Sequence, residues 1–101
     1  MNEHLIRMIP KIQNTYHTAV VTTASRKNCM EILEWFQIDK MFDLILTHED
    51  ITQVKPNPEG FLKAMDYFKV DAKKTIIFED SNVGIMAAEA SSASVMIVDK
   101  F

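Results

Sequence analysis

Hydrophobic positions along this chain switch repeatedly between the spacing of a helix and the short continuous runs of a buried strand. Apolar stripes at i, i+3, i+4 and i+7 predict helices over residues 3–14, after Ser25, after Asn57 and through residues 83–90. Apolar runs rich in β-branched residues predict strands at residues 18–23, 43–47, 75–78 and 94–98. Because helices and strands alternate, we expect a parallel sheet with helices on both faces, which is a three-layer α/β fold.

Prolines and capping residues refine where these helices begin. Pro10 lies inside the first stripe, which predicts either a kink there or a helix that begins near Met8. Ser25 is a favourable N-cap for the second helix. Asn57 is expected to cap the third helix with Pro58 at its first helical position, because proline fits the first turn of a helix.

The length and composition indicate a small globular domain and exclude several classes of protein. With 101 residues, 48% of them hydrophobic and 25% charged, the chain is expected to form one domain over residues 1–101. Its formal net charge of −3 gives no electrostatic basis for binding nucleic acid or an anionic membrane. The single cysteine, Cys29, excludes an internal disulfide and is assigned to core packing. Because no secretory signal or bilayer-length apolar run is present, a cytoplasmic protein is expected.

Polar residues follow the carboxyl ends of three predicted strands. Thr23 ends the first strand, and Lys55 lies in the loop after the second. Glu79 and Asp80 directly follow the third. Each has an ordinary explanation, because threonine satisfies backbone groups, surface lysine is solvated and acidic residues stabilise helix N-termini. Two adjacent carboxylates are less ordinary, since they repel each other and neither belongs in a dry core.

The shared location of these residues suggests a binding site. In an open parallel sheet, ligands bind in the crevice beyond the carboxyl ends of the strands. There the hydroxyl of Thr23 would donate a hydrogen bond to a phosphoryl oxygen, and Lys55 would offset negative charge. The carboxylates of Glu79 and Asp80 would hold a hard cation such as Mg²⁺, which bridges protein to phosphate. We therefore expect a phosphate-handling site with Mg²⁺ as its cofactor.

Three segments carry this chemistry in a defined order: residues 19–25 (AVVTTAS), 54–61 (VKPNPEGF) and 78–85 (FEDSNVGI). They resemble the second, third and fourth motifs of the haloacid dehalogenase superfamily, and are most similar to its β-phosphoglucomutase-like and phosphoglycolate phosphatase-like branch. The resemblance implies a Rossmann-like αβα core, with catalytic roles for Thr23 and Lys55. It also implies that Asp80 and Glu79 bind Mg²⁺. The phosphate-binding positions that it implies are Thr22, Thr23, Ala24, Ser25 and Lys55.

The first motif of that family, an Asp-x-Asp at the end of its first strand, does not occur in this sequence. In the family, the first Asp attacks phosphorus, and its strand lies centrally, between those that correspond to the Thr23 and Asp80 strands. The resemblance therefore implies an incomplete core of about four strands without its central nucleophile strand or its cap. Such a core has exposed inner edges. We expect residues 1–101 to be the C-terminal portion of a longer enzyme, its sheet completed by the missing N-terminal segment or by a second copy.

The expected function is that of a Mg²⁺-dependent phosphatase or phosphomutase core acting on a small phosphorylated metabolite. Without the nucleophile, this chain alone is expected to be inactive. The alternative is a non-catalytic remnant of the same fold that binds phosphate or a partner. A dehalogenase is less favoured, because dehalogenation needs no metal, whereas this sequence carries a predicted Mg²⁺ site. A response-regulator receiver domain is excluded, because its acidic pair precedes its Thr and Lys. Ser92 stands where the family usually has a helix-ending glycine, so it either adopts a left-handed conformation or the helix ends differently.

Overall fold

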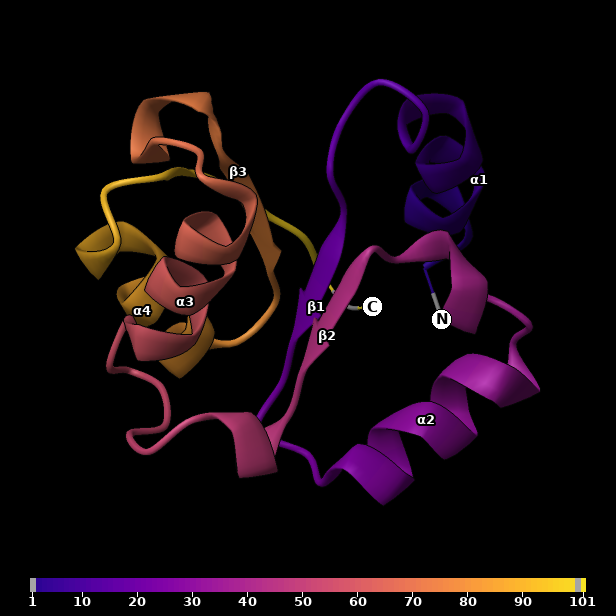
Figure 1. Ribbon diagram of the computed structural model, residues 1–101, viewed down its shortest axis with the longest axis horizontal. Helices are drawn as coiled ribbons and strands as arrows, with labels where there is room; N and C mark the ends of the chain where they lie inside the picture. The colour runs from indigo at the N-terminus through magenta and orange to yellow at the C-terminus, as the bar shows by residue number, and fades with distance from the viewer. Residues whose placement is uncertain (1, 100) are drawn as a thin grey trace.

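Short parallel strands form two separate pairs within residues 2–99 and 101, the part of the chain that the computed structural model describes (Figure 1). The strands are β1 (Ala19–Val21), β2 (Leu44–Leu46), β3 (Ile76–Glu79) and β4 (Ser94–Ile97). β1 pairs with β2, where Val20 lies opposite Ile45, and β3 pairs with β4, where Phe78 lies opposite Met96. Every predicted strand is present, although its bounds differ by up to two residues.

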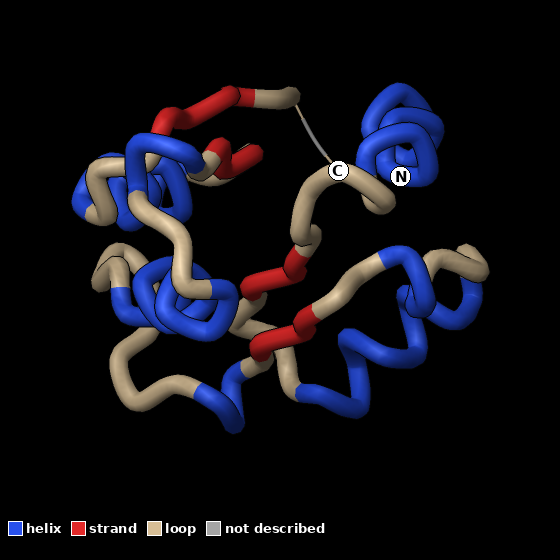
Figure 2. The backbone as a smooth tube through the Cα atoms, turned by 45° about the horizontal axis from the view of Figure 1, so that its top comes forward, coloured by secondary structure: helices blue, strands red, loops and turns tan. Residues whose placement is uncertain are grey.

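Helices alternate with these strands, which confirms the predicted α/β order. They are α1 (Glu3–Ile12), α2 (Arg26–Trp35), α3 (Glu59–Phe68) and α4 (Asn82–Ala90), together with the 3-10 helices η1 (Asp39–Met41), η2 (His48–Asp50) and η3 (Ala72–Lys74). Figure 1 shows α3 and α4 on one side of the strands and α1 and α2 on the other. Figure 2 shows the two strand pairs as separate groups with helices around them. The layers are therefore those of the expected αβα architecture.

The helix ends follow the capping residues, with small corrections to the predictions. α1 begins at Glu3 and continues through Pro10, so the alternative start near Met8 is wrong. Ser25 caps α2 as predicted, because its Oγ accepts a hydrogen bond from the backbone N of Asn28 at 3.2 Å.

α3 begins one residue later than predicted. Its first residue is Glu59, and Pro58 occupies the N-cap position with φ −78° and ψ 4°. Asn57 still acts as a cap, since its Oδ1 accepts from the backbone N of Glu59 at 2.9 Å. After α4, Ser92 has φ 72°, so the left-handed alternative expected for this residue is confirmed.

Two buried clusters hold the layers together. The larger one lies between α3, α4 and β3, and Val21 of β1 and Val95 of β4 pack against it. Its buried members are Phe61, Met65, Ile77, Ala87, Ala88 and Ala93. The smaller cluster consists of Cys29 and Leu33 on α2 and of Ile38 just after it, with Ile45 of β2 among its neighbours. The assignment of Cys29 to the core is confirmed, and burial raises the pKa of its thiol.

The inner edges of the two sheets are not paired with each other in the described residues. In a parallel ladder, alternate residues direct their backbone groups to the neighbouring strand. The backbone N of Thr22 donates to Leu46 O on β2 at 3.0 Å, so the carbonyl of Val21 points to the opposite side. Glu79 O accepts from the backbone N of Val98 at 3.0 Å, so the backbone of Phe78 points away from β4. These edges of β1 and β3 therefore have no partner strand within the described residues, as the family resemblance implied.

No helix among the described residues is long and apolar enough to cross a membrane.

Candidate functional site

Lys55 lies where the carboxyl ends of the two sheets meet. Its Nζ donates to the carbonyl oxygen of Val21, at the end of β1, at 3.1 Å. The same atom lies 2.6 Å from Oε2 of Glu79, at the end of β3. It also lies 4.9 Å from the ring centroid of Phe61, which is within the range of a cation–π contact. The side chains of Lys55 and Glu79 are only 13% and 7% exposed, so each charge depends on the other for compensation.

Glu79 is the last residue of β3, rather than part of the turn where the sequence placed it. Its Oε1 accepts from the backbone N of Asp80 at 3.3 Å, while its Oε2 binds Lys55. The carboxylate fills the space beside Gly84 in α4, where a Cβ atom would lie 2.1 Å from Oε1. Gly84 is therefore required for Glu79 to lie under the start of α4. A glycine inside a helical pattern often has such a packing reason, which is a signal that sequence reasoning did not use.

Asp80 follows β3 and is exposed at the same edge of the sheet. The sequence left open whether the acidic pair only caps the next helix. Ser81 is the cap instead, because its Oγ accepts from the backbone N of Gly84 at 3.1 Å. The carboxylate of Asp80 is therefore not used as the N-cap of α4.

The loop after β1, residues 22–25, begins one residue beyond the carbonyl that Lys55 binds. Oγ1 of Thr22 accepts from the backbone N of Ala24 at 3.1 Å, which forms a tight turn. Thr23 is exposed at this turn, and its hydroxyl makes no hydrogen bond to the rest of the described chain. Lys55 thus connects this loop to the β3 end, although its pairing with Glu79 was not foreseen from the sequence.

Metal binding at this edge would depend on a small donor set. Within residues 2–99 and 101, no three His, Cys, Asp or Glu side chains are grouped so that they could hold a metal ion by themselves. Mg²⁺ commonly uses one or two carboxylates and takes its other ligands from water and substrate phosphate. Asp80 and the neighbouring Glu79 are consistent with that pattern. Lys55 reduces the negative charge of Glu79, which makes Asp80 the more available donor.

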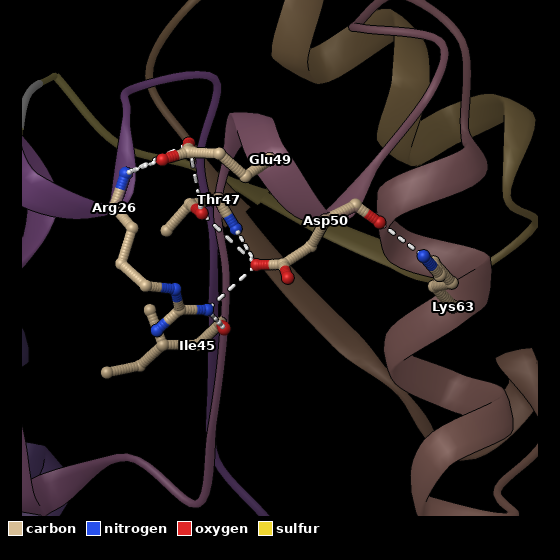
Figure 3. A network of polar contacts seen from close by, with 6 residues as sticks. All are labelled: Arg26, Ile45, Thr47, Glu49, Asp50 and Lys63. Carbon is tan, nitrogen blue, oxygen red and sulfur yellow. Dashed lines mark hydrogen bonds and ion pairs between the residues drawn. The ribbon is translucent and has the colours of Figure 1, made fainter.

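A second polar network, which sequence reasoning missed, supports the loop from the side of β2 (Figure 3). Arg26 N–H donates to both carboxylate oxygens of Glu49, and its guanidinium donates to Asp50 Oδ2 and Ile45 O, each at 2.8 Å. The pKa of the Asp50 carboxyl is lowered, first by the hydrogen bond from the backbone N of Thr47 and then by Arg26. The network joins residues more than 18 positions apart in the chain, which explains why no local motif revealed it.

Comparison with known proteins identifies the family. A family model described as haloacid dehalogenase-like hydrolase matches residues 1–98. The chain therefore belongs to the haloacid dehalogenase-like hydrolase family. A pyrophosphatase, PpaX, of Halalkalibacterium halodurans is 32% identical over 83 residues, which cover 82% of this chain and 39% of that protein.

Solved structures share the fold. A protein described as a predicted phosphoglycolate phosphatase, from Haemophilus somnus 129pt, has a TM-score of 0.83 and 27% identity; the match covers 89% of this chain and 40% of that one. CbbY of Rhodobacter sphaeroides, solved in complex with phosphate, has a TM-score of 0.87 and 23% identity, over 95% of this chain and 44% of that one. The chain thus spans less than half the length of these proteins.

Proposed function

We propose that residues 1–101 form the C-terminal portion of the core domain of a Mg²⁺-dependent phosphate-ester hydrolase of the phosphatase or phosphomutase type. The observation that carries this proposal is the position of Lys55. Its ammonium group joins the end of β1, which leads into the Thr22–Ser25 loop, to Glu79, which precedes Asp80. A hydroxyl, a cation and a free carboxylate at one sheet edge suit a phosphorylated ligand.

Each proposed site residue has a distinct part in binding. Thr23 donates its hydroxyl to a phosphoryl oxygen, and the remaining loop residues, Thr22, Ala24 and Ser25, shape the phosphate pocket. Lys55 neutralises the phosphoryl charge. Asp80, assisted by Glu79, holds Mg²⁺, which when bound stabilises negative charge on the transferring phosphoryl group. The proposed ligand is a small phosphorylated metabolite, supported by the names of the relatives, which include a pyrophosphatase.

The proposal includes inactivity of the 101-residue chain by itself. No Asp-x-Asp occurs in its sequence, so the phospho-aspartyl step of the family has no nucleophile here. The unpaired inner edges of β1 and β3 support the idea that a further strand belongs between them. An N-terminal segment of a longer chain is the favoured source of that strand, and a second copy is the alternative. The cytoplasmic location remains a prediction from the sequence.

Hydrolysis of 4-nitrophenyl phosphate tests this proposal. We expect no Mg²⁺-dependent release of nitrophenol by the 101-residue chain, and release when the chain is extended with the Asp-x-Asp segment of a relative. Turnover by the 101-residue chain alone would contradict the claim of inactivity. An extended protein that binds phosphate without turnover would favour the alternative, a non-catalytic phosphate-binding or partner-binding remnant.

Calorimetric titration with Mg²⁺ tests the metal assignment separately. Asp80→Asn is expected to weaken Mg²⁺ binding by about tenfold or more, because it removes a charged oxygen ligand. Asp71→Asn is the matched control, since Asp71 is an exposed aspartate that precedes η3, before the amino end of β3. Equal Mg²⁺ affinity of the Asp80 variant and the parent would rule out Asp80 as a ligand.

A further inference from the structure

The 3-10 helix η2 holds the proposed phosphate loop from the side opposite to Lys55. Two consecutive residues of η2 bind the two ends of the segment Ala24–Arg26. His48 donates its backbone N–H to the carbonyl of Ala24 at 2.9 Å. Glu49 accepts the backbone N–H of Arg26 with both carboxylate oxygens, at 3.0 and 3.1 Å. The loop that carries Thr23 is therefore fixed to the end of β2 as well as to its own strand.

η2 is itself firmly held, so it provides a fixed point for the loop. Thr47, just before η2, is fully buried, and its backbone N and Oγ1 donate to Asp50 Oδ2 at 2.8 and 3.1 Å. The side chain of Thr47 in turn accepts the backbone N–H of Asp50, which completes a capping box. Lys63 of α3 donates to the backbone carbonyl of Asp50, which ties η2 to the third helix (Figure 3).

The carboxylate of Glu49 accepts a hydrogen bond from the backbone N–H of the first residue of α2. The first N–H groups of a helix have no partner within the helix, and they attract anions. Because Glu49 occupies the Arg26 N–H, that group is not available to a phosphate, and the start of α2 is fixed in place. An incoming phosphate then encounters the turn formed by Thr22, Thr23 and Ala24.

On this geometry we propose that Glu49 is a positioning residue for phosphate binding: it holds the Thr22–Ser25 loop in its binding conformation without touching the ligand. This inference rests on the proposed function, because it assumes that the loop binds phosphate. Two opposed effects follow. The Glu49 charge repels a phosphate nearby, whereas its hydrogen bonds to Arg26 order the loop.

Substitutions at Glu49 separate these two effects. Glu49→Gln keeps one oxygen acceptor for the Arg26 N–H and removes the charge, so it binds phosphate at least as tightly as the parent. Glu49→Ala removes charge and acceptor together, and its affinity falls about fivefold below that of Glu49→Gln. Glu49→Asp keeps the charge on a shorter side chain that no longer reaches, so it too binds more weakly than Glu49→Gln. Glu31→Ala, an exposed glutamate on α2, is the charge-matched control and behaves as the parent.

The experiment is a titration of the 15N-labelled 101-residue chain and its variants with inorganic phosphate, followed by the amide signals of residues 22–26. Hydrogen exchange of the Arg26 amide is measured in the same samples without phosphate, and is expected to accelerate in the Ala and Asp variants. Equal phosphate affinities for the Gln variant and for the Ala and Asp variants would overturn the positioning role, even if exchange accelerates. If either the Ala or the Asp variant fails to fold, the phosphate affinity of the other one is compared with that of the Gln variant, and this comparison tests the positioning role. A parent chain whose loop signals do not respond to phosphate would overturn the proposed function, and this inference with it.

Discussion

The two halves of the molecule differ in how many of their apolar side chains are buried. The half formed by β3, β4, α3 and α4 contains the larger cluster, in which Ala87 and Ala88 are completely buried. The half formed by β1, β2, α1 and α2 has the smaller cluster, and α1 has no buried residue. Trp35 at the end of α2 is 82% exposed. The second half therefore has fewer fully buried apolar side chains than the first.

The difference shows why the proposed site depends on the junction between the halves. The Thr22–Ser25 loop belongs to the loosely packed half, and Glu79 and Asp80 belong to the well-packed half. Lys55 binds to both, through Val21 O and Glu79 Oε2. The residues proposed to hold Mg²⁺ thus belong to the well-packed half, while the loop on the other side has additional support from η2.

The largest expected effect on stability comes from shortening a buried side chain in the well-packed half. Met65→Ala is expected to lower the free energy of unfolding by about 2–5 kcal/mol, because Met65 is buried in the larger cluster. Ile9→Ala on α1 is the matched test in the other half and should cost about 1 kcal/mol, since Ile9 is only partly buried. Urea unfolding measures both. Equal losses would contradict the comparison between the halves.

Breaking the ion pair between the halves should have the next largest effect. Glu79→Gln is expected to cost about 3 kcal/mol, because it leaves the buried ammonium of Lys55 without a charged partner. Lys55→Met should cost a similar amount, and the double variant less than the sum of the two. Additive losses in urea unfolding would mean that the two charges do not interact.

The pH dependence of Asp50 offers a smaller test within the loosely packed half. Its pKa is lowered in the folded state, so its contribution is present at neutral pH and is lost as the pH falls below its ordinary value of 3.8. Asp50→Asn is expected to cost about 1 kcal/mol at neutral pH and less in acid, as measured by urea unfolding. Asp66→Asn, an exposed aspartate on α3, is the control. A loss that stays constant with pH would contradict this role of the Asp50 charge.

The smallest effect is expected at the exposed end of α2. Trp35→Ala should change the free energy of unfolding by about 0.5 kcal/mol or less, because the side chain is already mostly in contact with water. Thermal unfolding is a sufficient measurement. A loss of the size expected for Met65→Ala would show that Trp35 is covered in solution, and that the packing of the two halves is more alike than the structure indicates.

Sequence reasoning predicted the features that depend on local pattern. The alternation of strands and helices and the Ser25 cap follow from short-range rules, and both are confirmed. The left-handed conformation of Ser92 was one of two alternatives that the family resemblance left open. The assembly of Lys55 with the β3 end followed from strand order, because parallel strands bring their carboxyl ends to one edge.

Contacts between residues that are far apart in the chain could not be predicted from the sequence. Nothing local indicates that Glu79 turns inward to Lys55, 24 residues away, or that Gly84 leaves room for its carboxylate. The Glu49–Arg26 contact spans 23 residues and depends on how β2 aligns beside β1. These features arise from tertiary packing, so they required coordinates.

The central claim is that the ends of β1 and β3 contribute to one phosphate site. It is tested most directly by titrating the 15N-labelled chain with inorganic phosphate in the presence of Mg²⁺. We expect the amide signals of Thr22–Ser25 and of Asp80 to shift along a single saturation curve, and Lys55→Met to abolish both shifts. Shifts in only one of the two segments, or none in either, would contradict it.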